Sequence, residues 1–81
     1  MDLIVMAIRD RALDSYGTPF FVTAVGQGVR GFTDEINKKA EGNMLNAHPE
    51  DFDLFVLGSY DTSSGLFKTD VPRQVAVGSI S

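Results

Sequence analysis

The sequence contains no cysteine and only one histidine among its 81 residues. Without cysteine, disulfide bonds, thiolate nucleophiles and zinc–cysteine sites are excluded. Small secreted domains usually carry disulfides, so their absence favours a reducing cytoplasmic location. The single histidine, His48, has no nucleophile at a spacing that marks a catalytic pair. The sequence therefore predicts a protein that is not an enzyme.

Long hydrophobic runs are also missing. The longest uninterrupted apolar run covers residues 3–8, whereas a membrane-spanning helix needs about 20 predominantly apolar residues. The same run has neither the basic flank nor the small-residue cleavage site of a secretory signal peptide. We therefore expect neither a membrane-spanning segment nor a membrane partner.

Positive charge is scarce as well. Seven basic residues stand against eleven acidic residues, which gives a net charge of −4. An acidic protein repels nucleic-acid phosphates at long range, so binding to nucleic acid would require a local basic patch. The length predicts one domain over residues 1–81 with a thin core, and a homodimer would add to its stability and could enlarge such a patch.

The hydrophobic pattern predicts an antiparallel sheet with one helix. Apolar residues at Val25, Val29, Phe32 and Ile36 form one stripe, which predicts an amphipathic helix over residues 24–40. Apolar and β-branched runs bounded by turn residues predict five short strands, at residues 3–8, 18–22, 52–60, 66–69 and 71–80. Residues 9–17 are polar and predict a loop or a hairpin connection. The expected fold is α+β, in the order ββαβββ, with the helix packed on one face of the sheet.

Residues 26–31 read GQGVRG, which has the glycine spacing of a dinucleotide-binding loop. That loop requires a βαβ unit in a doubly wound sheet. Here the apolar stripe runs through the glycines, which places them inside the predicted helix. We expect a close contact of this helix with the sheet or with a partner subunit, and no bound cofactor.

Residues 48–53 read HPEDFD and contain four side chains that can bind a divalent metal ion, namely His48, Glu50, Asp51 and Asp53. A local turn explains the same residues, because Pro49 favours the first position of a turn and acidic residues favour its amino end. We favour the turn and expect no metal.

Arginine and tyrosine residues are the candidates for a nucleic-acid site. Arg9, Arg11 and Tyr16 lie in the first predicted loop, and a single-strand groove uses guanidinium groups for phosphates and ring faces for bases. A second strip on the sheet could contain Tyr60, Lys68 and Arg73, and Arg30 on the helix completes the set. In the alternative interpretation, which composition alone favours, Tyr16 packs over the edge of the core and the charges form a solvated surface.

The most specific motif in the sequence is HPEDFDLFVLGSYD at residues 48–61, accompanied by PFFV at 19–22 and VRGFTDEIN at 29–37. With these motifs most of the chain resembles the small nonstructural protein family of gokushovirus-type microviruses, which are single-stranded DNA phages. The resemblance implies a DNA-binding protein of viral genome replication in the host cytoplasm, acting at the switch to synthesis of single-stranded progeny DNA. It supplies no catalytic or base-contacting residues.

The resemblance and the acidic composition leave two hypotheses open. In the first, the protein is a homodimeric module that binds single-stranded DNA. In the second, it is an interaction or assembly factor that contacts phage replication or capsid proteins and has no affinity for DNA.

Overall fold

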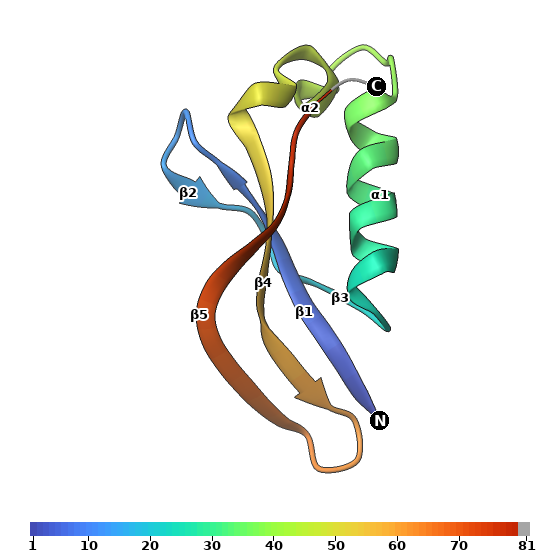
Figure 1. The fold of residues 1–81 in the computed structure, drawn as a ribbon, viewed down its shortest axis with the longest axis vertical. Coiled ribbons are helices and arrows are strands. Elements are labelled where there is room, and N and C mark those ends of the chain that lie inside the picture. Colours follow the sequence, from blue (N-terminus) through green and yellow to red (C-terminus); the bar gives the residue numbers. More distant parts are fainter. Residues whose placement is uncertain (80–81) are drawn as a thin grey trace.

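A computed structural model describes residues 1–79, and residue 80 of the last predicted strand lies outside this range. Figure 1 shows an antiparallel sheet with one long helix against one of its faces, which confirms the predicted α+β class. The elements are β1 (Asp2–Asp10), β2 (Ser15–Tyr16), β3 (Phe20–Val22), α1 (Val25–Asn37), α2 (Met44–Ala47), the 3-10 helix η1 (Pro49–Asp51), β4 (Phe52–Asp61) and β5 (Leu66–Val77).

Strand β1 organises the sheet. One edge of β1 pairs with β4 along its whole length, and β4 pairs in turn with β5. The other edge of β1 pairs with two short strands, β3 near its middle and β2 near its end. The sheet therefore has β5 as one edge strand and the short strands β2 and β3 along the opposite edge.

The order of the elements differs from the predicted ββαβββ, because the strand β2 and the short helix α2 are added and the last two predicted strands form one. Residues 9–17 form the hairpin connection that the sequence allowed besides a loop, because β1 continues to Asp10 and the chain returns as β2. Residues 66–77 form one strand and not two, because β4 is long enough to pair with both segments and the irregularities are absorbed as bulges. Pro72 is tolerated inside β5 because β5 is an edge strand, in which not every backbone N–H has to donate a hydrogen bond to a neighbouring strand.

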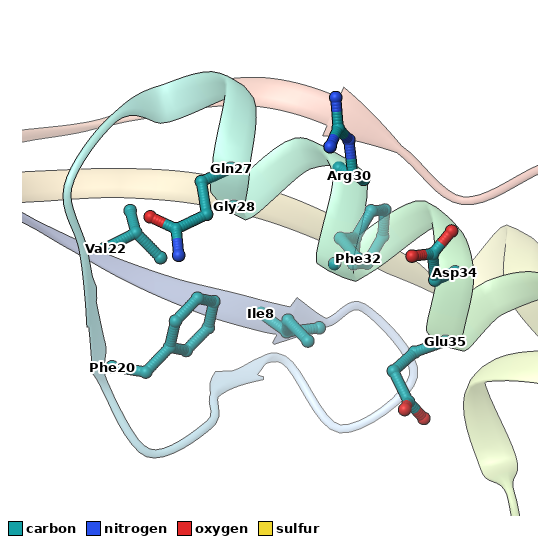
Figure 2. Close-up of a pocket in the computed structure, with 10 residues that line it drawn as sticks. Ile8, Phe20, Val22, Gln27, Gly28, Arg30, Phe32, Asp34 and Glu35 are labelled. Carbon is teal, nitrogen blue, oxygen red and sulfur yellow. The ribbon is translucent and has the colours of Figure 1, made fainter.

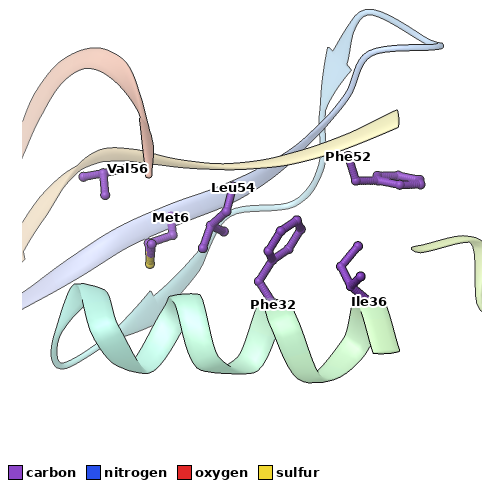
Figure 3. Close-up of a cluster of buried hydrophobic side chains, with 6 residues drawn as sticks. All are labelled: Met6, Phe32, Ile36, Phe52, Leu54 and Val56. Carbon is purple, nitrogen blue, oxygen red and sulfur yellow. The ribbon is translucent and has the colours of Figure 1, made fainter. Parts of the chain in front are cut away.

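The core lies between α1 and the sheet. It is built from Met6, Phe32, Ile36, Phe52, Leu54 and Val56, which Figure 3 shows in contact across the two layers. The predicted stripe is confirmed, since α1 turns Phe32 and Ile36 into this core. None of the helices within residues 1–79 has the length and apolar character needed to cross a bilayer.

Helix α1 is shorter than the predicted 24–40. It ends at Asn37, and Lys38 is already in an extended conformation. The side chain of Asn43 explains this end, because its Nδ2 donates hydrogen bonds to the carbonyl oxygens of Glu35 (2.9 Å) and Lys38 (2.8 Å). These carbonyls at the helix end thus gain a partner outside the helix.

The glycines of GQGVRG lie inside α1, as predicted, and form no loop. The close contact with the sheet occurs at one of them. Gly28 is buried, and a Cβ atom at this position would overlap Sδ of Met6. At Gly26 and Gly31 a Cβ atom would meet nothing within 4 Å. Only Gly28 is therefore required by packing against β1.

The β4–β5 hairpin ends in a turn organised by one carboxylate. Asp61 accepts hydrogen bonds from the backbone N–H of Ser63 and from Oγ of Ser64, both at 2.9 Å. The Ser63 hydrogen bond, followed by that of Ser64, holds the pKa of Asp61 below its ordinary value. The turn is therefore stabilised by the ionised form of Asp61.

Candidate nucleic-acid interface

The two faces of the sheet have different surroundings. Side chains alternate along a strand, and Met6 and Ile8 of β1 pack on the side of α1. By the same alternation Phe20 and Val22 of β3 point toward α1, and Phe21 between them points to the opposite side. No element among residues 1–79 packs over that opposite side, which we call the open face (Figure 1).

Five aromatic rings lie on the open face, in two groups. In the first, Tyr16 and Phe55 meet edge to face, with ring centroids 5.4 Å apart and planes at 78°. In the second, the ring of Tyr60 is 4.8 Å from that of Phe67 and 5.8 Å from that of Phe21. Three of the rings remain accessible, with exposed fractions of 44% for Tyr16, 47% for Phe21 and 60% for Phe67.

The register of the sheet places these rings in sequence along β1. Four of the five rings neighbour a β1 residue on the open face, and successive residues on one face are about 6.6 Å apart along a strand. From one end to the other the pairs are Arg9↔Tyr16, Ala7↔Phe55, Val5↔Phe21 and Leu3↔Tyr60. These four rings thus follow a line of roughly 20 Å, and Phe67 lies beside Tyr60, directly across from it on β5.

Arg9 is the predicted cation that the structure brings to these rings. Its Cζ lies 5.8 Å from the centroid of Tyr16, which is within cation–π range. The same guanidinium forms an ion pair with Asp14 in the adjacent turn. Arg9 in β1 and Tyr16 in β2 are therefore held together at one end of the open face.

Arg11 has a different environment. Its Nε lies 3.1 Å from Oδ2 of Asp53, and its Nη2 donates to the carbonyl oxygen of Glu50. Asp53 is only 3% exposed, and its Oδ1 has no hydrogen-bond partner within residues 1–79. A buried carboxylate requires a compensating charge, so Arg11 serves the stability of this end of the sheet.

The remaining predicted residues do not join one strip. Tyr60 lies on the open face but is half-buried among the other rings. Lys68 follows Phe67 and so points to the opposite side, and Arg73 pairs with Val56 of the core. Arg30 is exposed on α1, on the helix side of the sheet (Figure 2). Arg30, Lys68 and Arg73 are therefore separated from the rings by the sheet.

Sequence reasoning missed Phe21, Phe55 and Phe67 as candidates. Residues 20–22 and 54–57 are apolar at every position, which is typical of strands that are covered on both faces. The apolar pattern shows that both faces of these strands carry apolar side chains. It does not show that the single helix α1 covers only one of the two faces, which leaves the rings on the other face accessible.

The HPED segment folds as the predicted turn. Pro49 opens η1, and the backbone N–H of Asp51 donates to the carbonyl oxygen of His48 at 3.0 Å. The turn brings donor atoms of His48, Glu50 and Asp51 within 4.8 Å of one another at the surface. Asp53 points elsewhere and pairs with Arg11. Nothing else in the described part of the chain points to an ion at this turn.

Comparison with known proteins identifies relatives among phages. A family model described as Phage ORF5 protein matches residues 3–80. Protein ORF5 of Chlamydia phage 1 is 32% identical over 69 residues, which cover 83% of this chain and 72% of that protein. No solved structure matches the chain.

Proposed function

This chain belongs to the Phage ORF5 protein family, and from this premise we propose that it binds single-stranded DNA on its open face during viral genome replication. Membership confirms the predicted resemblance to a family of small phage proteins. In the proposed role the protein is a nonstructural component that acts in the host cytoplasm at the switch to synthesis of single-stranded progeny DNA. It catalyses no reaction and holds DNA through stacking.

The observation that carries this proposal is the line of accessible rings on the open face. Aromatic side chains on an uncovered sheet offer flat apolar surfaces on which unpaired bases stack, whatever the sequence of the strand. Tyr16 and Phe21 supply such surfaces at two points along β1, and Phe67 supplies a third on β5, across from Tyr60. Exposed aromatic groups of this kind, gathered on one face of a small protein, are typical of an interaction site.

The scarcity of cations defines the expected binding mode. Arg9 is the one arginine placed against a ring of the open face in the described part of the chain. For single strands, the logarithm of the affinity falls with the logarithm of salt concentration with a slope of about −0.7 for each phosphate contact. One or two phosphate contacts therefore predict a slope of about −1 for the logarithm of the affinity against the logarithm of salt concentration. Binding is therefore dominated by stacking and only weakly dependent on salt.

Fluorescence anisotropy with a labelled oligothymidylate tests the proposal. Stacking contributes about 1–3 kcal/mol per base, so Phe67→Ala should weaken binding by about 5- to 150-fold. Leu66→Ala is the matched control, because Leu66 is equally exposed and adjacent in sequence but offers no ring. Absence of binding by the unaltered protein at hundreds of micromolar would refute the proposal. Equal affinities of the Phe67 and Leu66 variants would refute the role of the open face.

The acidic composition favours a second candidate function. A net charge of −4 and an apolar face also suit an interaction factor that contacts phage replication or capsid proteins. A pull-down from infected cells separates the two functions. Recovery of one phage protein by the unaltered chain and not by Phe67→Ala, without affinity for DNA, would favour the second function.

A further inference from the structure

Strand β5 is an edge of the sheet, and one of its two sides has no strand beside it (Figure 1). Among residues 1–79 the strand that pairs with β5 is β4, on the other side. Residues 66–74 of β5 are exposed throughout, and α1 does not extend over this end of the hairpin (Figure 1). An edge strand of this length offers a row of N–H and C=O groups to which a further strand can be added.

The hydrogen bonds of the hairpin show which residues of β5 face this free edge. The carbonyl oxygen of Asp61 accepts a hydrogen bond from the N–H of Gly65 at 2.8 Å, so Asp61 directs its backbone groups toward β5. Leu66 pairs with Asp61 in the register of the sheet and therefore directs its own backbone groups toward β4. Consecutive residues of a strand direct these groups to opposite sides. The backbone groups of Phe67 and Thr69 therefore face the free edge.

The charges of this segment are complementary to themselves in one antiparallel register. Residues 66–72 read LFKTDVP, and a second copy that pairs antiparallel about Thr69 places Lys68 of each copy opposite Asp70 of the other. Opposite charges in opposed positions stabilise a strand pair, and like charges destabilise it. Lysine on an edge strand normally discourages pairing with other strands, whereas this register compensates it. The complement lies within the segment itself, so a second copy of the chain supplies it.

The apolar residues fit the same register. Phe67 and Val71 are 60% and 87% exposed, and Phe67 of each copy lies opposite Val71 of the other. An aromatic ring opposite a β-branched side chain is a favourable cross-strand pair. Pro72 lies opposite Leu66, whose backbone groups are directed toward β4. The missing N–H of Pro72 therefore removes no hydrogen bond from the new strand pair.

We propose that two copies of the chain join through β5 in this register, about a two-fold axis that passes between the two Thr69 residues. Because Thr69 faces the free edge, the two copies of this residue exchange both N–H···O hydrogen bonds at the centre of the contact. A surface that meets an identical surface is the form of contact that two-fold dimers use. Opposed residues of a strand pair lie on the same face, so the open faces of the two copies adjoin on one side of the joined sheet.

Sedimentation velocity over a range of concentrations tests the proposal. We expect the mass to rise from the 8.8 kDa of one chain to twice that value. Lys68→Asp and Asp70→Lys each place like charges opposite one another, so each should raise the dimer dissociation constant about tenfold or more. The variant that combines both substitutions restores opposite charges and should associate like the unaltered chain. A mixture of the two single variants should also associate, because every charge pair between them is then of opposite sign.

A cysteine at the two-fold axis tests the register. The chain contains no cysteine, and the Cα atoms of a hydrogen-bonded antiparallel pair are about 5.5 Å apart, which a disulfide can span. Thr69→Cys should therefore form a covalent dimer on oxidation, detected by non-reducing electrophoresis. Leu66→Cys is the matched control, because Leu66 is exposed (68%) on the same strand but its two copies lie roughly 20 Å apart in this register.

Three results would each overturn the proposal. The first is a mass that stays at one chain up to millimolar concentration. The second is a dimer that the single charge variants leave unchanged or that the combined variant fails to restore, and the third is equal cross-linking of the two cysteine variants. Far-ultraviolet circular dichroism verifies that the variants are folded. None of them removes a ring of the open face, so these results are independent of whether the protein binds DNA.

Discussion

Replacing Gly28 and Gly31 by alanine should change stability in opposite directions, although both lie in the same helix. At Gly31 the new methyl group meets nothing within 4 Å, so the helix propensity acts alone and stabilises the fold by about 0.5–1 kcal/mol. At Gly28 the methyl group overlaps Sδ of Met6, so this fully buried side chain has to change its position in the core.

Overpacking of a core by one methyl group destabilises by about 1–3 kcal/mol. After subtraction of the propensity gain, Gly28→Ala should destabilise the protein by about 1 kcal/mol. The two variants should therefore differ by about 2 kcal/mol. For a domain of this size each kcal/mol corresponds to about 4–8 °C in melting temperature.

Urea denaturation at one low protein concentration measures both variants without a contribution from association. A double-mutant cycle with Met6→Ala identifies the contact, because Gly28→Ala should become stabilising once the Met6 side chain is shortened. The reasoning fails if Gly28→Ala is as stabilising as Gly31→Ala, or if the effect of Gly28→Ala is the same in the presence and absence of the Met6 side chain.

Two further predictions concern charged groups. The Ser63 hydrogen bond lowers the pKa of Asp61 from 3.8, so the stabilisation of the turn is complete above pH 3.8 and is lost as the pH falls through the lowered pKa. A ¹³C NMR titration of the Asp61 carboxyl group measures this pKa, and a titration midpoint at or above 3.8 would contradict the prediction. Arg11→Ala should destabilise by about 1–3 kcal/mol, because it leaves the buried Asp53 without its cation. Thermal melting measures this, and adding Asp53→Asn should restore part of the loss if the unpaired charge is the cause.

The class of the fold could be predicted because its signals are local. The stripe that ends in Phe32 and Ile36 identified the helix, and the apolar runs identified most of the sheet. The end of the helix could not be predicted, since it depends on Asn43 reaching back across a loop. The single long strand β5 was also not predicted, because it depends on a distant partner. Its two halves form one strand since β4 is long enough to pair with both, whereas the residues around Pro72 alone favour a break.

The candidate site was predictable only in part. Arg9 and Tyr16 are near in sequence, and a hairpin brings them together. Phe21 and Phe67 belong to strands at opposite edges of the sheet, and their contact (6.2 Å between ring centroids) depends on the strand order. Strand order and the coverage of each face are properties of the whole chain, which local patterns do not encode.

Helix α1 covers only part of the sheet, and the β4–β5 hairpin extends past it (Figure 1). That far end has no helical layer on either side, and residues 66–74 of β5 are exposed throughout. Segments with few buried contacts open and reclose locally at a small fraction of the free energy of global unfolding. A ligand proposed to stack on Phe67 would therefore meet an end of the sheet that has few buried contacts, and its binding free energy would include the entropy lost when that end is ordered.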